Sequence, residues 1–138
     1  MRIVVAYDGS EDAKEGLNLA LKFLKEDKGD LTVITIVAKR EDMSKEEIER
    51  LKKKGEALLE EVKAMVKDIP LKTAILEDYS VAEAILKYVE KVEADLLIMG
   101  AKGTRADILR FTLGSTTAKV VSFAPCSVFV VRKKVVED

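Results

Sequence analysis

The amino-acid sequence predicts an α/β fold in which five strands alternate with four helices. Short apolar runs rich in β-branched residues recur along the chain, and the segments between them carry apolar residues at helical spacing. No linker, low-complexity tract or internal repeat interrupts this alternation. Because each strand-helix-strand link of this length requires a right-handed crossover, we expect a parallel sheet with helices on both faces. We expect one domain over residues 1–138.

The first two strands flank an amphipathic helix. Residues 2–7 (RIVVAY) form a β-branched run that closes at Asp8-Gly9-Ser10. Apolar residues then recur at helical spacing until Gly29: Ala13, Leu17, Ala20, Leu21 and Leu24. The second strand is predicted over residues 31–37 (LTVITIV).

The longest helix follows a charged loop at residues 39–42. Ser44 and Glu47 have the spacing of a capping box, which predicts the start of the helix. Its apolar stripe comprises Ile48, Leu51, Leu58, Leu59, Val62, Met65 and Val66. The many charges between these residues indicate a solvated face.

The remaining strands and helices are marked by Pro70 and by a second capping box. Residues 71–76 form the third strand, and Ser80 with Glu83 opens a helix that extends to about Val92. Residues 96–99 (LLIM) suit a strand that is buried on both faces. The last helix is predicted over residues 115–123 and the last strand over residues 127–131 (SVFVV).

Composition excludes several classes of partner. The 24 basic and 25 acidic residues leave a net charge of −1, so no long-range field favours nucleic acid or an anionic membrane. Aromatic residues make up 5% of the chain and tryptophan is absent, which leaves little for base stacking. The apolar runs are too short to span a bilayer.

The cysteine and histidine counts restrict location and chemistry. Cys126 is the single cysteine and cannot form an internal disulfide, which agrees with a reducing compartment. The N-terminal residues also lack the form of a signal peptide, so we expect a cytoplasmic protein. Because the chain has no histidine, it has no His-based acid-base catalysis and no Ser-His or Cys-His nucleophile pair.

A candidate phosphate-binding site follows the fourth strand. Gly100 and Gly103 let the backbone approach a ligand closely, and the helix that begins near Gly114-Ser115-Thr116 offers unpaired N–H groups and the positive end of its dipole. Turn glycines with Ser115 as a plain helix N-cap are the alternative interpretation. The first strand ends at Asp8, and ligands of parallel sheets bind at such carboxyl ends.

Together these motifs resemble the universal stress protein family over essentially the whole chain. The resemblance rests on the early strand ending in Asp8-Gly9-Ser10, on ADLLIMGAKG at residues 94–103, on Gly114-Ser115 and on APCSVFVV at residues 124–131. It implies a single doubly wound five-stranded parallel sheet in the order 3-2-1-4-5, similar to the adenine nucleotide alpha hydrolases. The sheet reversal then lies between strands one and four.

The resemblance also implies an ATP site. ATP-binding members carry the pattern G-x2-G-x9-G-(S/T), and here ten residues rather than nine separate Gly103 from Gly114. The extra residue falls in a loop, where insertion costs little. The residues that the resemblance places around the nucleotide are Ala6 and Val37 near adenine, Met99 and Gly100 near the sugar, and Gly103, Gly114, Ser115 and Thr116 around the phosphates; Tyr7 is assigned to the same site.

Asp8 has two interpretations. The resemblance places it beside the ribose-phosphate or a bound Mg²⁺, and the alternative is an Asp-Gly turn that caps the following helix. Lys102 and Arg105 lie in the same loop as Gly103, where they either contact phosphate or are simply solvated. Cys126 is interpreted as a small buried residue and not as a nucleophile.

Three function classes follow. The first is an ATP-binding regulatory or stress-response protein, with Mg²⁺ bound through the phosphates. The second is a nucleotide-free stress protein that acts through dimerisation and partner contacts. The third, an enzyme, is disfavoured because GxxxxGK[ST], GxGxxG and HxGH patterns are all absent. We expect a homodimer through the edge strand at residues 127–131, since pairing removes the hazard of a bare apolar edge.

Overall fold

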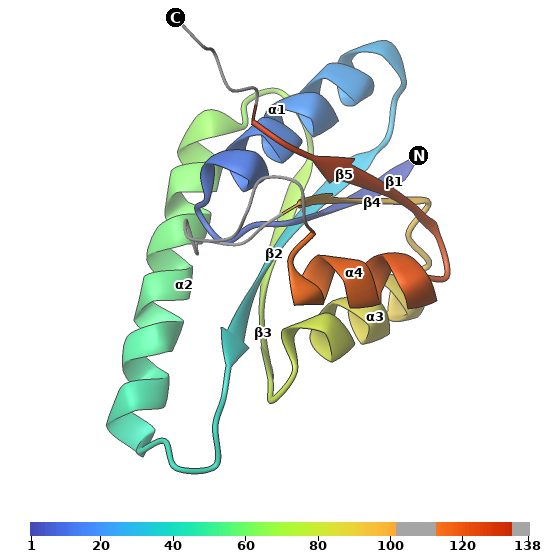
Figure 1. Ribbon diagram of the computed structural model, residues 1–138. Helices are drawn as coiled ribbons and strands as arrows, with labels where there is room; N and C mark the ends of the chain where they lie inside the picture. The colour runs from blue at the N-terminus through green and yellow to red at the C-terminus, as the bar shows by residue number, and fades with distance from the viewer. Residues whose placement is uncertain (102–112, 134–138) are drawn as a thin grey trace, which may run out of the picture.

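The computed structural model describes residues 1–101 and 113–133, which form one parallel sheet with helices on both faces (Figure 1). In chain order the elements are β1 (Arg2–Ala6), α1 (Glu11–Glu26), β2 (Asp30–Ala38), α2 (Lys45–Met65), β3 (Leu71–Asp78), α3 (Val81–Lys91), β4 (Leu96–Gly100), α4 (Ser115–Phe123) and β5 (Ser127–Val131). The sheet order is β3-β2-β1-β4-β5 and every strand pair is parallel, so the predicted fold class and strand order are confirmed.

Strands β2 and β3 extend beyond their predicted ends. They stay paired from Leu31 with Leu71 to Ala38 with Asp78. The backbone N–H of Lys39 then donates to the carbonyl of Asp78, with 2.9 Å between the nitrogen and the oxygen. The predicted strand stopped at the apolar residues, whereas backbone pairing continues through the charged ones, because a ladder depends on main-chain groups.

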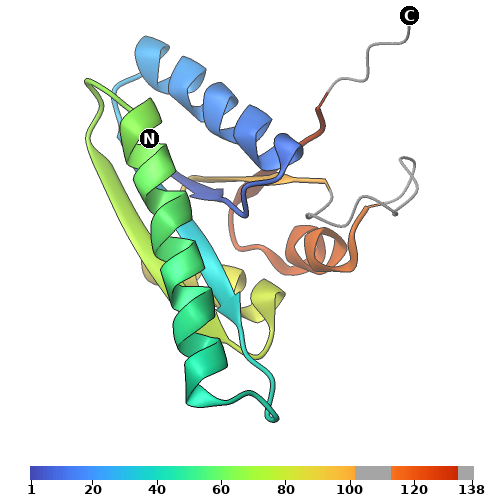
Figure 2. The ribbon, with the colours of Figure 1, turned by 90° about the vertical axis from the view of Figure 1, so that its left-hand side faces the viewer.

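The core has two layers, one on each face of the sheet. On one face β1 and β2 pack against α1 and α2, and Figure 2 shows α2 lying across the sheet on this side. The buried residues of this layer include Ile3, Val5, Tyr7, Leu17, Leu31, Val33, Leu59, Val62 and Ile98. On the other face α3 and α4 cover a smaller layer, which includes Val4, Ile34, Ile85, Leu97, Met99 and Val120.

The apolar stripe of α2 is confirmed at its centre and wrong at its end. Leu59 and Val62 are buried, but Met65 is 43% exposed. Met65 lies about 60° from Val62 around the helix, at the margin of the stripe. It is also the last helical residue, and the core contact passes to Val66, which is buried.

No helix within the described residues is long and apolar enough to cross a membrane.

Candidate functional site

The sheet reverses its winding between β1 and β4, and the pairing of these two strands stops early. Their last pair is Val5 with Ile98. Strand β1 continues alongside β2 to Ala6, whereas β4 continues alongside β5 to Gly100. The carboxyl ends of β1 and β4 therefore pair with different neighbours at the point where open α/β sheets bind their ligands.

Helix α4, which begins beside this point, differs from the other three helices at its N-terminus. Helices α1, α2 and α3 are each capped by a serine hydroxyl, from Ser10, Ser44 and Ser80, and each has an acidic residue in its first turn. Helix α4 has Gly114 as its N-cap, no side-chain cap bond and no acid in its first turn. Among the described residues, no side chain therefore neutralises its first N–H groups or its positive dipole end.

These caps decide two sequence interpretations. Ser115 is the first helical residue and not the N-cap, so the plain-cap interpretation of Ser115 was wrong. The capping box at Ser80 is half formed. The Ser80 hydroxyl accepts from the N–H of Glu83, but the Ser80 N–H donates to Asp78 and the carboxylate of Glu83 pairs with Lys119 instead.

The start of α4 is fixed to the end of β4 by two hydrogen bonds. The N–H of Gly114 donates to the carbonyl of Ala101, and the hydroxyl of Thr117 donates to the carbonyl of Gly100, each over 2.9 Å. The N–H of Ala101 in turn donates to the carbonyl of Val131 on β5. Ala101 and Thr117 are buried. The position of Gly114 is therefore set by β4, whatever number of residues the chain uses between them.

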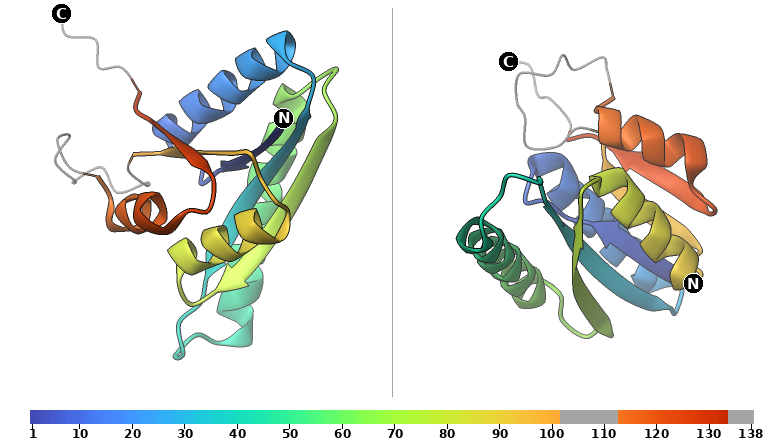
Figure 3. Two further views of the ribbon diagram at one scale, coloured as in Figure 1. Left: turned by 90° about the vertical axis from the view of Figure 1, so that its right-hand side faces the viewer. Right: turned by 90° about the horizontal axis from the view of Figure 1, so that it is seen from below.

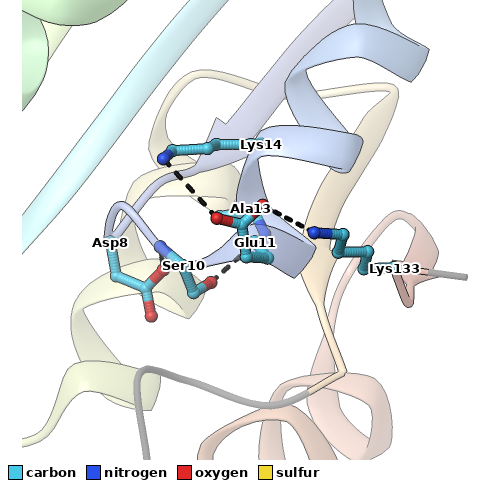
Figure 4. A network of polar contacts seen from close by, with 6 residues as sticks. All are labelled: Asp8, Ser10, Glu11, Ala13, Lys14 and Lys133. Carbon is cyan, nitrogen blue, oxygen red and sulfur yellow. Dashed lines mark hydrogen bonds and ion pairs between the residues drawn. The ribbon is translucent and has the colours of Figure 1, made fainter. Parts of the chain in front are cut away.

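Asp8 lies in a tight turn after β1. One oxygen of its carboxylate accepts from the N–H of Ser10 over 2.9 Å, and Gly9 has φ +82° (Figure 4). Ser10 caps α1 by accepting from the N–H of Ala13, so Asp8 stabilises the turn but is not the helix cap. The Asp8 side chain is exposed, which leaves its second oxygen facing solvent.

Lys133 connects this turn region to the end of β5. Its backbone N–H donates to the carboxylate of Asp12 over 2.7 Å, and its ammonium lies 3.3 Å from the carboxylate of Glu11, which also faces Lys14 (Figure 4). The end of β5 and the two residues that follow it thus contact both halves of the candidate site, with Lys133 on the α1 side and Val131 on the β4 side.

The remaining predicted site residues divide into two groups. Those close to the reversal point are Ala6, Met99, Gly100, Gly114, Ser115 and Thr116. Val37 lies farther away, on β2, three residues beyond the partner of Ala6, and its side chain is buried. Gly103, Lys102 and Arg105 lie outside the described residues.

Tyr7 follows the last residue of β1. Its backbone N–H already donates to the carbonyl of Ile34, and its side chain is buried in the layer beneath α1 and α2. Burial raises the pKa of the Tyr7 hydroxyl, and the carboxylates of Glu61, Asp8 and Glu11 raise it further.

Sequence reasoning missed Thr117 and Asp12. Nothing in the run Gly114-Ser115-Thr116-Thr117 distinguishes Thr117, which bonds to the end of β4, from Thr116, which is half-buried. The contact of Asp12 with Lys133 joins residues that are 121 positions apart. Burial raises the pKa of the Cys126 thiol, which favours the interpretation of Cys126 as an unreactive residue.

The sheet order and the helix start at the reversal point place this chain among the doubly wound α/β proteins, a class in which ligands generally bind at that point. A sequence profile described as the universal stress protein family matches residues 1–132. A universal stress protein of Methanocaldococcus jannaschii is 33% identical over an alignment 141 residues long including gaps. The alignment covers 96% of this chain and 82% of that protein. The chain belongs to the universal stress protein family.

Solved structures agree with this assignment. Universal stress protein UspA from Lactobacillus plantarum superposes with a TM-score of 0.74 at 28% identity, covering 94% of this chain and 96% of that chain. The universal stress protein from Archaeoglobus fulgidus in complex with dAMP gives a TM-score of 0.70 at 19% identity, covering 96% and 98% of the two chains. At 19% identity, the similarity to the Archaeoglobus fulgidus protein shows only that the two chains share a fold.

Proposed function

We propose that this universal stress protein binds ATP with Mg²⁺ at the reversal point between β1 and β4, and that it acts as a nucleotide-dependent regulatory module in the stress response. The observation that supports this most is the free N-terminus of α4, which is fixed to the end of β4 through Gly114 and Thr117. Backbone N–H groups at such a helix start bind phosphate without a basic side chain. A family member in complex with dAMP supports an adenine nucleotide as the ligand.

The hydrogen bond between Gly114 and Ala101 bears on the ten-residue spacer. Because this bond closes the loop between the two residues, one extra residue within the loop does not move α4 relative to β4. The phosphate-binding N–H groups of Ser115 and Thr116 then keep their place despite the departure from the family pattern. Adenine is assigned to the backbone near Ala6 and Val37.

Asp8 suits a Mg²⁺ ion that arrives with the nucleotide. It is exposed and has one carboxylate oxygen free of the turn, and oxygen is the ligand that Mg²⁺ prefers. Within residues 1–101 and 113–133, no group of three acidic, histidine or cysteine residues is placed to hold a metal. The nucleotide phosphates would therefore supply the other ligands of the Mg²⁺ ion.

We propose that the protein binds ATP without hydrolysing it. Asp8 is the one acid assigned to the site, and phosphoryl transfer also needs a positioned water and charge stabilisation.

The partner proposal is a homodimer through β5. This strand is at the sheet edge, and large apolar side chains are exposed on it and on the neighbouring α4. Phe129 is 45% exposed, Val121 45% and Phe123 70%. Pairing of two β5 strands would cover this apolar edge. We place the protein in the cytoplasm, in keeping with its single cysteine.

The test begins with the protein as purified. Acid extraction should release adenine nucleotide, and ATP with Mg²⁺ at about a hundred times Kd should stabilise the fold by about 2.7 kcal/mol, measured as a thermal shift. GTP should stabilise it less. Sustained ATP hydrolysis that is lost in Asp8→Asn would contradict the assignment as a non-enzyme.

Thr117→Val tests whether the contact between α4 and the end of β4 supports the phosphate site. It removes the hydroxyl that donates to Gly100, and we expect a smaller ATP-dependent shift as well as a loss of about 1 kcal/mol in the absence of nucleotide. Ser122→Ala is the matched control, because its hydroxyl on the same helix donates only to the carbonyl of Ala118. If the wild type carries no nucleotide and shows no ATP-dependent shift, the nucleotide-free alternative, acting through dimerisation and partner binding, replaces this proposal.

A further inference from the structure

Strand β3 forms the other edge of the sheet, and half of its backbone groups face outward. The N–H of Leu31 donates to Pro70, and the N–H of Lys39 donates to Asp78. These two bonds fix the alternation of the parallel ladder, so the backbone N–H and C=O groups of the even-numbered residues of β3 point toward β2. The N–H and C=O groups of Thr73, Ile75 and Glu77 therefore point away from the sheet, where no described residue bonds to them.

A groove of about 550 Å³ runs along this edge. Its floor is the second half of β3, from Ile75 to Asp78. Lys52 and Glu56 of α2 line one wall, and Lys87 and Lys91 of α3 line the other. The right-hand view of Figure 3 shows β3 at the sheet edge with α2 and α3 on opposite sides of it. The floor spans about 10 Å at the rise of a strand.

The two walls differ in charge. On the α3 side Lys87 and Lys91 are one turn apart; Lys87 lies 3.3 Å from the carboxylate of Asp78, and Lys91 has no ion pair with any described residue. On the α2 side Lys52 lies 3.0 Å from Glu77, a hydrogen bond that raises the pKa of the Lys52 ammonium. The positive charge that is left without a partner is therefore on the α3 side.

We propose that the outer edge of β3 binds an extended segment of a partner protein as a sixth strand, with acidic side chains at alternate positions facing Lys87 and Lys91. The outward backbone groups of Ile75 and Glu77 supply the ladder bonds of such a strand. Because side chains of a strand alternate between its faces, every second residue of the segment meets the α3 wall. Lys91, which has no ion pair with a described residue, selects an acid at the position that faces it, and Lys87, which is paired with Asp78, adds to the positive charge of this wall.

A second copy of this chain fits the edge less well. A twofold pairing of two β3 strands would place the α3 helices of both copies on the same side of the joined sheet. Lys87 and Lys91 of one copy would then face the same two lysines of the other. Like charges at this distance oppose association, whereas an acidic segment is attracted. The proposal does not depend on nucleotide binding.

The test uses a pool of acetylated heptapeptides with Glu at positions 2, 4 and 6 and Val or Thr elsewhere, added to the whole protein without nucleotide. In NMR titrations the amide signals of Thr73, Ile75 and Glu77 should shift, and the amides of Ile75 and Glu77 should exchange more slowly with solvent. The same peptides with N-methylated alternate residues keep their charge but lose the ladder bonds, so they should not bind. Absence of binding at millimolar peptide, or binding that survives N-methylation, would overturn the proposal.

Three variants locate the site. Ile75→Pro removes an outward donor without breaking a bond to β2, and it should abolish peptide binding. Lys91→Glu should weaken binding by about fivefold to tenfold. Lys53→Glu is the matched control, because Lys53 is an exposed residue of α2 outside the groove. Equal weakening by Lys53→Glu and Lys91→Glu, or peptide-induced self-association seen by light scattering, would also reject it.

Discussion

Tyr7 is 2% exposed, and its hydroxyl has no hydrogen-bond partner among the described residues. A buried hydroxyl without a partner gives up its bonds to water and gains nothing in exchange. The ring itself packs between β1 and the helices α1 and α2. The ring of Tyr7 therefore stabilises the core while its hydroxyl opposes that effect.

Tyr7→Phe is expected to keep or raise stability by about 1 kcal/mol at neutral pH, since it removes the unpaired hydroxyl and retains the ring. The folded-state pKa of Tyr7 is raised above its ordinary value of 10.0, because ionisation of the buried hydroxyl is disfavoured in the folded protein, so the stability of the wild type falls as the pH rises above 10. The variant should therefore lose stability less steeply above pH 10. Chemical denaturation between pH 7 and 11 measures both effects, and a variant that is less stable than the wild type at pH 7 would reveal a partner for the hydroxyl.

Residues that act on their immediate neighbours were predictable from the sequence. Ser44 and Ser80 cap their helices as their spacing to Glu47 and Glu83 indicated. Thr117 was not predictable, because its partner Gly100 is 17 residues away across a loop. The direction of its side chain depends on how α4 packs against β4, and the helix starts with three consecutive hydroxyl residues that a pattern treats alike.

At the scale of elements, β5 holds α1 and β4 together. Its end reaches α1 through Lys133 and Asp12, and it reaches β4 through Val131 and Ala101. The contact of Lys133 with Asp12 joins residues near the two ends of the chain. In both contacts the donor is a backbone N–H group. The two halves of the candidate site are therefore kept in register by a strand that contributes no predicted nucleotide contact.

Asp12→Ala is expected to cost about 0.5 to 1.5 kcal/mol and to speed hydrogen exchange at the amide of Lys133, because that N–H loses its acceptor. Asp12→Asn keeps a carbonyl oxygen at the same place and should lose less. Glu15→Ala, at an exposed position on α1, is the control for helix propensity. Equal losses in Asp12→Asn and Asp12→Ala would show that charge at the helix start matters and the bond to Lys133 does not.

Element types were predictable because short apolar runs rich in β-branched residues alternate with segments whose apolar residues recur at helical spacing. Element ends were less so. Strand β3 runs two residues past its predicted end, through Glu77 and Asp78, since its ladder with β2 is indifferent to side-chain charge. Met65 was wrongly assigned to the core because helical spacing places it in the apolar stripe of α2. At this end of the helix the buried residues are Val62 and Val66, and Met65 is exposed.

At the scale of the whole molecule, the two sheet edges are expected to bind different partners. Light scattering should give twice 15.3 kDa, the mass of a dimer through β5. The backbone groups of Val131 point toward β4, so the N–H of the preceding residue, Val130, points outward. Val130→Pro should therefore yield monomers without disturbing the sheet. Ile75→Pro at the opposite edge is the matched control and should remain dimeric. A wild type that stays monomeric at micromolar concentration would exclude the β5 dimer.

The strand order was the part of the fold that apolar patterns alone could not provide. All five strands read as similar apolar runs, and nothing in their spacing ranks them across the sheet. The resemblance of the motifs at Asp8, at Gly100 and at Gly114 to a known family supplied the order that pairing confirms. The candidate site could be assembled only once the fold was known, because its two halves come from residues about ninety positions apart in the chain.

The hydrogen bond between Gly114 and Ala101 has an evolutionary consequence. Because the N–H of Gly114 is bonded to the carbonyl of Ala101, a change in the number of residues between these two positions would leave the sheet and α4 in place. Relatives can acquire different attachments at this point without redesigning the scaffold. An insertion that would be harmful inside a strand would, at this position, change the surface beside the candidate site.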